Sequence, residues 1–245
     1  MRVAVAGGTG LVGRLVVAEL EKTGHDPVVL ARSRGVDLTS GAGLAERIAG
    51  CGAIIDVTNV VTLSRARAIA FFGGVTGHLI AAAKQAGAGH LIALSIVGVD
   101  RVAYGYYQGK REQETLLEQG GVPWTVLRAT QFFEFPEPLL AHRFPIAAMP
   151  KMLSQPVAAA DVATALVDLV DAGPSGYAPP IAGPERLRMV DMARRIERAR
   201  GSHRPVLPIP LPGKVGRQMA SGDLIPDGAY TEGKRTFGEY LATLR

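Results

Sequence analysis

The chain opens with MRVAVAGGTGLVGRLVVAEL, residues 1–20, and this stretch decides the fold. An apolar run at residues 3–6 ends in a glycine-rich segment at residues 7–10, and apolar residues then recur at helical spacing from Leu11. The pattern predicts a strand, a glycine turn and a helix. The glycines fit both G-x-G-x-x-G from Gly8 and G-x-x-G-x-x-G from Gly7, so the register of the turn stays open.

The chemistry of this turn points to a dinucleotide, with a purely structural tight turn as the alternative. Glycines let backbone N–H groups approach a pyrophosphate, which then lies at the positive N-terminal end of the following helix. The predicted contacts of the turn are Gly7, Gly8, Thr9, Gly10, Leu11, Val12 and Gly13.

Length and composition favour one α/β domain over residues 1–245, built on a doubly wound, Rossmann-like parallel sheet. The net charge of +5 is dispersed and only 6% of residues are aromatic, so we expect no nucleic-acid face but attraction to an anionic ligand. The single cysteine, Cys51, excludes an internal disulfide framework and fits a cytoplasmic protein. No cluster of metal ligands is expected.

The sequence also predicts no membrane segment, because no run reaches about 18 uninterrupted apolar residues. The first helix carries Arg14, Glu19 and Lys22, so the N-terminal segment is not expected to be a signal peptide.

A second strand is predicted at residues 27–31, and Arg32, Ser33 and Arg34 follow it directly. In a doubly wound sheet this position lies beside the adenosine ribose, where arginines pair with the 2′-phosphate of NADP and a carboxylate would select NAD. We therefore expect NADP(H) to be preferred, with NAD(H) possible; two solvated loop arginines are the alternative.

The segment at residues 35–40 follows so quickly that the usual helix and third strand must be heavily abbreviated there. Asp37 and Leu38, within this segment, are included among the predicted cofactor contacts.

Further strands are predicted at residues 53–57, 90–95 and 123–128, as the fourth to sixth of the sheet, with a helix at residues 77–86. Carboxyl ends of parallel strands line the ligand crevice. The residues that follow or end these strands, and are predicted to contact the cofactor, are Thr58, Asn59, Ser95 and Thr130.

A chemical cluster is predicted around the helix that includes residues 106–117. Tyr106 and Lys110 are four residues apart and share a helix face. The Tyr106 phenol could exchange a proton with substrate if the Lys110 ammonium lowers its pKa; Lys110 could also hold the nicotinamide ribose, and Ser95 could hydrogen-bond the reacting oxygen. The alternative is a surface helix with solvated charges, and Tyr104 or Tyr107 could face the site instead of Tyr106.

The sequence resembles the NmrA-like atypical short-chain dehydrogenases/reductases over roughly residues 1 to 195. The segments that carry the resemblance are AGGTGLVGR, HLIALSIVGVD, YYQGKREQE, GGVPWTVLRATQFFEF, QPVAAADVATALVDLV and IAGPERL. The resemblance implies a Rossmann-like domain with a small C-terminal substrate lobe, here about residues 131–155 and 178–245. It also implies NAD(P)H bound at Gly7, Gly10, Gly13 and Arg32, with Lys110 as the helix lysine.

Members of that family often lack the complete Ser-Tyr-Lys set. Some reduce quinones, enones or related small molecules, whereas others bind NADP without turnover and regulate transcription. We therefore expect an NADPH-dependent oxidoreductase acting on a small carbonyl, enone or quinone. The alternatives are a non-catalytic NADP(H)-binding redox sensor and, more weakly, a structural nucleotide-binding subunit. A monomer or a dimer is compatible with the sequence.

Overall fold

A parallel sheet forms the centre of the protein in this computed structural model, which describes residues 1–142 and 144–244. The strands of the sheet are β1 (Arg2–Ala6), β2 (Asp26–Leu30), β3 (Ala53–Asp56), β4 (His90–Ile96), β5 (Trp124–Ala129), β8 (Gly176–Tyr177), β9 (Ile181–Ala182) and β12 (Thr231–Glu232). Their order is β12-β9-β5-β4-β3-β1-β2, β8 pairs with β5, and all these pairings are parallel. The α/β, doubly wound fold class is thus confirmed.

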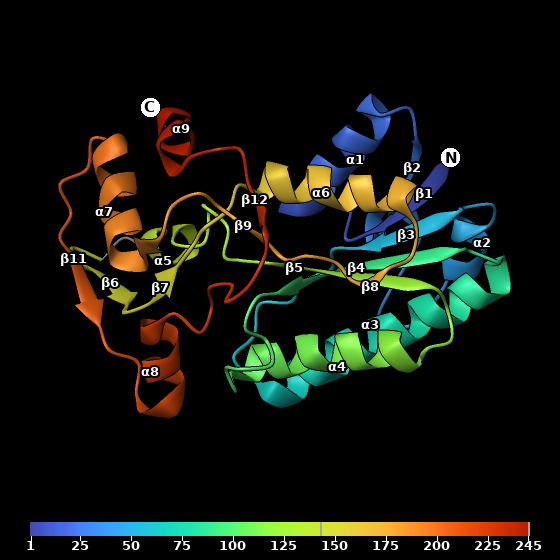
Figure 1. Ribbon diagram of the computed structural model, residues 1–245, viewed down its shortest axis with the longest axis horizontal. Coiled ribbons are helices and arrows are strands. Elements are labelled where there is room, and N and C mark those ends of the chain that lie inside the picture. Colours follow the sequence, from blue (N-terminus) through green and yellow to red (C-terminus); the bar gives the residue numbers. More distant parts are fainter. Residues whose placement is uncertain (143, 245) are drawn as a thin grey trace.

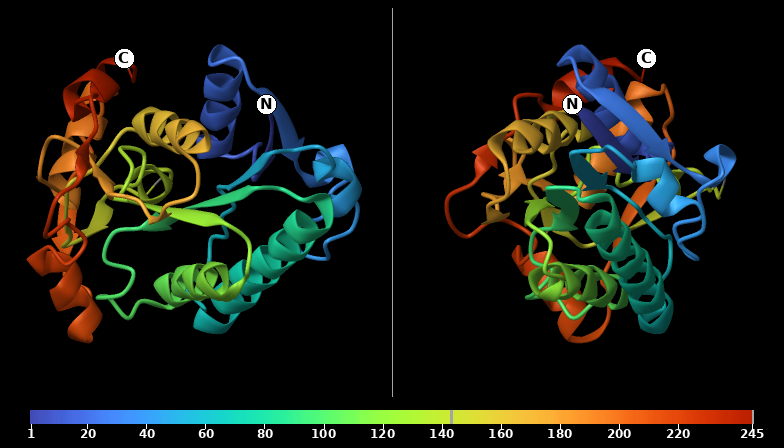
Figure 2. Two further views of the ribbon diagram at one scale, coloured as in Figure 1. Left: turned by 45° about the vertical axis from the view of Figure 1, so that its right-hand side comes forward. Right: turned by 90° about the vertical axis from the view of Figure 1, so that its right-hand side faces the viewer.

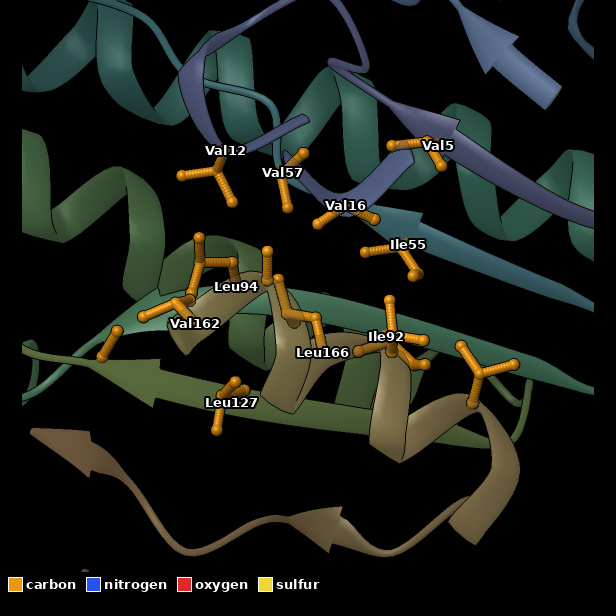
Figure 3. Close-up of a cluster of buried hydrophobic side chains, with 14 of the residues drawn as sticks. Val5, Val12, Val16, Ile55, Val57, Ile92, Leu94, Leu127, Val162 and Leu166 are labelled. Atoms are coloured by element: carbon orange, nitrogen blue, oxygen red, sulfur yellow. The ribbon is translucent and has the colours of Figure 1, made fainter. Parts of the chain in front are cut away.

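Helices cover both faces of the sheet (Figure 1). One face carries α1 (Leu11–Lys22) and α6 (Ala159–Ala172), and the other carries α2 (Leu44–Ile48), α3 (Arg65–Ala86) and α4 (Gly105–Gln119). Alternate side chains of each strand therefore enter two different cores, as Val5 and Ala6 of β1 do. Figure 3 shows the first core, in which Val16 of α1, Ile92 of β4 and Leu166 of α6 lie near one another. Burial of both strand faces explains the continuous apolar runs in the sequence.

Helix α3 is longer than the sequence predicted: it begins at Arg65, where Ser64 accepts a hydrogen bond from the Arg67 amide, instead of at residue 77. Glycines obscured its first half in the sequence. Helix α3 packs closely against α4, and this explains Gly109 on α4. A Cβ at that position would lie 2.6 Å from the backbone of Ala68 on α3. By length and composition alone α3 could span a membrane, although its buried side chains pack into the second core of this fold.

The expected abbreviated third strand is not present between Leu30 and Ala53 in the part of the chain that the structure describes. A 3₁₀ turn, η1 (Arg32–Arg34), and α2 occupy this segment, with only an isolated bridge between Asp37 and Ala42. Gly35, Gly41 and Gly43 have positive φ and turn the chain too sharply for a strand. The strands predicted as fourth to sixth are therefore β3, β4 and β5.

The predicted lobe segments gather around a third hydrophobic core at one end of the molecule (Figure 2). Their elements are α5 (Glu137–Leu140), β6 (Ala147–Pro150), β7 (Leu153–Ser154), β10 (Leu187–Arg188), α7 (Met189–Ala199), β11 (Val206–Ile209), α8 (Gly213–Ser221) and α9 (Phe237–Ala242). β10 pairs antiparallel with β7, and β11 pairs parallel with β6. Two strands from the same part of the chain, β9 and β12, extend the main sheet instead.

Candidate active site

The glycine turn joins β1 to α1 at the carboxyl edge of the sheet. Gly7 has φ +80°, and the Gly10 amide donates to the Gly7 carbonyl at 2.9 Å. A Cβ on Gly13 would overlap the same carbonyl, so the helix approaches the turn closely only because residue 13 is glycine. The two possible motif alignments, from Gly7 and from Gly8, therefore describe the same turn.

The first turn of α1 is open to an anion. Gly10 is the N-cap and, among the described residues, α1 has no side-chain cap and no acidic side chain in its first turn. Thr9, Gly10 and Leu11 are exposed, whereas Gly8, Val12 and Gly13 are buried. Unpaired helix amides and the helix dipole suit a pyrophosphate, so the residues present fit the phosphates of a dinucleotide.

The residues after β2 form an exposed basic turn, since Arg32, Ser33 and Arg34 make up η1 and all three are exposed. Asp37 accepts hydrogen bonds from the Thr39 hydroxyl and amide, which together with the nearby Arg32 charge lower the pKa of its carboxyl group. The Leu38 carbonyl accepts a hydrogen bond from His78 of α3 at 3.0 Å. Asp37 and Leu38 therefore stabilise the loop beside the basic turn.

A buried hydrogen-bonded chain links the end of β3 to α4. Asp56 accepts from the Thr58 amide at 2.9 Å and from Gln113 Nε2 at 2.7 Å. Gln113 Oε1 accepts from Lys110 Nζ at 3.0 Å, and Lys110 also donates to the Leu94 carbonyl of β4 at 2.9 Å. The chain fixes α4 to the ends of two neighbouring strands.

Lys110 is almost completely buried. Its Nζ is 4.3 Å from the centre of the Phe72 ring. Burial lowers the pKa of the Lys110 ammonium to about 8, against the opposing effect of the Asp56 and Glu114 charges.

Tyr104, Tyr106 and Tyr107 all pack at the third core, and the rings of Tyr106 and Tyr107 contact each other, but their hydroxyl groups have different partners. The Tyr106 hydroxyl donates to Asn59 Oδ1 at 2.7 Å, beside the end of β3. Tyr107 and Tyr104 pack edge to face in the third core. Burial raises the pKa of all three phenols. Contrary to the sequence-based expectation for Tyr106, its phenol pKa is raised, because burial of the phenol dominates.

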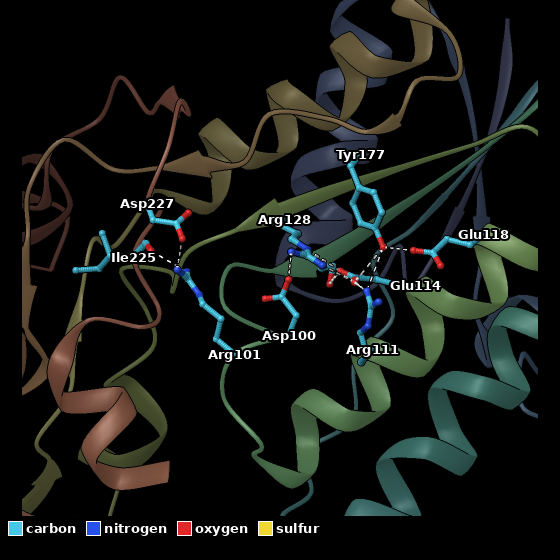
Figure 4. Close-up of polar contacts among 10 residues, drawn as sticks. Asp100, Arg101, Arg111, Glu114, Glu118, Arg128, Tyr177, Ile225 and Asp227 are labelled. Atoms are coloured by element: carbon cyan, nitrogen blue, oxygen red, sulfur yellow. Dashed lines mark hydrogen bonds and ion pairs between the residues drawn. The ribbon is translucent and has the colours of Figure 1, made fainter. Parts of the chain in front are cut away.

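Ser95 takes part in a different network, in which it bonds to Glu114; Figure 4 shows Glu114 with Arg111 and Arg128. The Ser95 hydroxyl donates to Glu114 Oε1 at 2.6 Å, and the same carboxylate pairs with Arg111 and Arg128, each at 2.8 Å. Arg128 also pairs with Asp100 at 2.9 Å. The proton of the Ser95 hydroxyl is thus committed to a buried carboxylate, and the expected donor to a reacting oxygen is not found in this arrangement.

The predicted residues thus divide into two groups. Asn59 and Tyr106 are in direct contact, whereas Ser95 and Lys110 bond to other partners. Thr58 is buried, and its hydroxyl has no hydrogen-bond partner among the described residues. The Thr130 hydroxyl donates to the Gln155 carbonyl at 2.6 Å.

Two residues of the buried chain, Asp56 and Gln113, were missed in the sequence. A signal existed for each: Asp56 is a lone acid at the end of an apolar strand, and Gln113 follows Lys110 by three residues on the same helix face.

Comparisons with known proteins identify the family of the chain and its fold. The profile of a family described as NAD(P)H-binding matches residues 7–172. The chain is similar to the (4-alkanoyl-5-oxo-2,5-dihydrofuran-3-yl)methyl phosphate reductase of Streptomyces griseus, with 29% identity over 219 residues, covering 81% of this chain and 74% of that protein.

Solved structures share the fold. One is the UDP-glucose 4-epimerase of Bifidobacterium longum in complex with NAD⁺ and UDP, with a TM-score of 0.77, 12% identity, and coverage of 100% of this chain and 97% of that one. Another is the NADPH-dependent quinone oxidoreductase QOR2 of Escherichia coli in complex with NADPH, with a TM-score of 0.73, 20% identity and 99% coverage of each chain. Since the family match spans more than half of the sequence and begins at the glycine turn, the chain belongs to the NAD(P)H-binding family.

Proposed function

We propose that the protein is an NADPH-dependent reductase of a small enone, quinone or carbonyl compound. The observation that carries this proposal is the Tyr106 phenol, placed beside Asn59 at the same edge of the sheet as the glycine turn. Carboxyl ends of parallel strands are where ligands bind in this fold. When bound, the reduced nicotinamide supplies a hydride.

Tyr106 is proposed as the proton donor. Because burial raises its pKa, the phenol keeps its proton at neutral pH and can give it to an oxygen or carbon that becomes negative during reduction. Asn59 Oδ1 orients the hydroxyl in the meantime. This protonation state suits reduction better than the reverse oxidation, which needs a phenolate as base.

Lys110 is proposed to hold the nicotinamide ribose and to anchor Tyr106. An ammonium group has three hydrogens to donate, and Leu94 and Gln113 take two of them, which leaves one for a ribose hydroxyl. The same two bonds fix α4 one turn beyond Tyr106. Ser95 is not proposed as a donor to substrate because its hydroxyl proton is directed to Glu114.

The exposed turn of Arg32, Ser33 and Arg34 supports a preference for NADPH. Two guanidinium groups and a hydroxyl can donate to a dianionic 2′-phosphate, and no carboxylate lies within η1 to select two free ribose hydroxyls.

The substrate class is supported by the relatives. The Streptomyces griseus protein is named as a reductase of a 5-oxo-2,5-dihydrofuran, an unsaturated lactone, and the Escherichia coli neighbour is named as a quinone oxidoreductase. Both substrate types have a double bond conjugated to a carbonyl group, and reduction of either builds negative charge on oxygen that a phenol can neutralise.

The test is consumption of NADPH, followed by its absorbance, across a panel of 2,5-dihydrofuran-2-ones, quinones, open-chain enones and aldehydes. Turnover of at least one conjugated compound, with product identified by mass spectrometry, is the expected result. Tight NADPH binding with no consumption across the panel would overturn the proposal in favour of a cofactor-binding sensor.

A further inference from the structure

We propose that Gln131 pairs with the carboxamide group of the nicotinamide and so fixes the orientation of the ring. The inference rests on the NAD(P)H binding that is part of the proposed function, and it is independent of the substrate and of Tyr106. Gln131 lies two residues beyond β5, at the carboxyl edge of the sheet.

The order of strands places this residue at the nicotinamide end of the crevice. The basic turn follows β2 and the glycine turn follows β1, and the sheet then continues through β3 and β4 to β5. A dinucleotide with its 2′-phosphate at Arg32 and its pyrophosphate at the glycine turn therefore extends toward the ends of β3, β4 and β5. Gln131 lies in that direction.

The backbone at Gln131 is held firmly. The Gln131 carbonyl accepts from the Val157 amide at 2.9 Å, and the Phe133 amide donates to the Val157 carbonyl at 3.2 Å. The preceding Thr130 amide donates to the Ile181 carbonyl at 3.0 Å. The position is thus rigid, as a residue that orients a ligand requires.

The side-chain amide, in contrast, has no hydrogen-bond partner within normal distance, although it lies near the Tyr107 phenol and partly opposes the burial that raises the pKa of that phenol. Gln131 is only 6% exposed, and neither its Oε1 nor its Nε2 atom has a hydrogen-bond partner among the residues that the structure describes. Among the described residues, Gln131 is the one buried side-chain amide in which both polar atoms lack a hydrogen-bond partner. Gln155, for comparison, lacks a partner only at Oε1, because its Nε2 donates to the Gly183 carbonyl. A buried unpaired polar group is destabilising by about 1–3 kcal/mol and calls for an explanation.

The chemistry of the two free atoms indicates a primary carboxamide. A substrate carbonyl could accept from Nε2 but would leave Oε1 unpaired, whereas a carboxamide offers both an acceptor and a donor. Since both Gln131 atoms are shielded from solvent, the side chain must turn about its own bonds to reach the ligand. That turn breaks no hydrogen bond of normal length to a described residue and gives up only the looser contact with the Tyr107 phenol.

The experiment compares three ligands by titration calorimetry with the unaltered protein and with Gln131→Met, which keeps the length of the side chain without its amide. The ligands are NADPH, 2′-phospho-ADP-ribose, which lacks the nicotinamide, and the reduced 3-acetylpyridine analogue of NADPH, in which a methyl group replaces the carboxamide nitrogen.

We expect Gln131→Met to weaken NADPH binding roughly 10-fold, the equivalent of two neutral hydrogen bonds, and to leave 2′-phospho-ADP-ribose binding unchanged. The unaltered protein should bind the acetylpyridine analogue several-fold more weakly than NADPH, and Gln131→Met should bind the two alike. Without ligand, the Tm of Gln131→Met should equal or exceed that of the unaltered protein, because the substitution removes an unpaired buried amide.

Three results would each overturn the inference: unchanged NADPH affinity, an equal loss for 2′-phospho-ADP-ribose, or a lower Tm without ligand. If Gln131→Met does not fold, equal affinities of the unaltered protein for NADPH and the acetylpyridine analogue are sufficient to reject it. Because the readout is binding, a failure here is distinct from a failure to find turnover.

Discussion

Two polar regions near the carboxyl ends of the strands differ in how completely their buried groups are paired. The fully buried Glu114 carboxylate is bonded to Ser95, Arg111 and Arg128. Figure 4 shows Glu114 with both arginines, and the Tyr177 ring lies against Arg128. At the carboxyl edge of the sheet, the Thr58 hydroxyl and the Gln131 amide are buried without partners among the described residues.

The difference indicates what each region is for. Polar groups that stabilise a fold pair with one another, because an unpaired buried group opposes folding. Groups that bind a ligand must keep some of their hydrogen-bonding capacity free. We therefore expect the Glu114 network to be needed for stability and the edge near Tyr106 and Gln131 to be needed for binding and turnover.

The largest expected effect is on stability, from Glu114→Ala. The substitution leaves Arg128 partly buried without its main partner, and removal of one member of a buried ion pair lowers the free energy of unfolding by about 3–5 kcal/mol. Urea denaturation measures this loss. The control is Gln119→Ala, at an exposed position on the same helix, where about 0.5 kcal/mol is expected. If both variants lose the same free energy of unfolding, the Glu114 network is not specifically needed for stability.

Turnover should respond most to Tyr106→Phe. Removing a general acid lowers kcat by about 10²–10⁴-fold, whereas loss of one hydrogen bond to Asn59 lowers stability by only about 1 kcal/mol. Steady-state kinetics on the substrate found in the panel measures the change, with Tyr104→Phe as the matched control. Retained activity in Tyr106→Phe together with lost activity in Tyr107→Phe would transfer the role to the neighbouring tyrosine.

A third test follows how stability depends on pH through His90, a buried residue at the amino end of β4. Burial lowers the pKa of His90 to about 4, from about 6.5 in an unfolded chain. Between these values the unfolded state binds more protons than the folded state, so stability decreases as pH falls, by about 3 kcal/mol at pH 4. Urea denaturation at several pH values measures the slope, and His90→Gln should remove this contribution. An unchanged slope in His90→Gln would assign the pH dependence to other groups.

The smallest of these effects concerns the exposed basic turn. Charge-assisted hydrogen bonds are worth about 1.5–3 kcal/mol before screening, so Arg32→Ala should reduce NADPH affinity roughly 10- to 150-fold and leave NADH affinity nearly unchanged. Direct titration of both cofactors tests this. Equal binding of NADH and NADPH by the unaltered protein would reject the NADPH preference. A preference that survives Arg32→Ala would point to Arg34.

Local features were predictable from the sequence. The strand, glycine turn and first helix are consecutive in the chain, so their apolar spacing and glycines were sufficient to indicate them. The same holds for the second strand and the basic turn after it. The α3 helix was underpredicted because Gly73 and Gly74 interrupt its apolar pattern, whereas its packing against α4, which stabilises it, is visible only in the fold.

The partners of the site residues depended on tertiary structure. By itself, the sequence determined that Ser95 ends a strand and that Tyr106 and Lys110 share a helix face. Only the fold decided that Ser95 faces Glu114, that Lys110 donates to Leu94, and that Tyr106 reaches Asn59, 47 residues earlier in the chain. The physical reason is that periodicity fixes which face a side chain occupies, whereas the packing of strands and helices fixes what lies opposite that face.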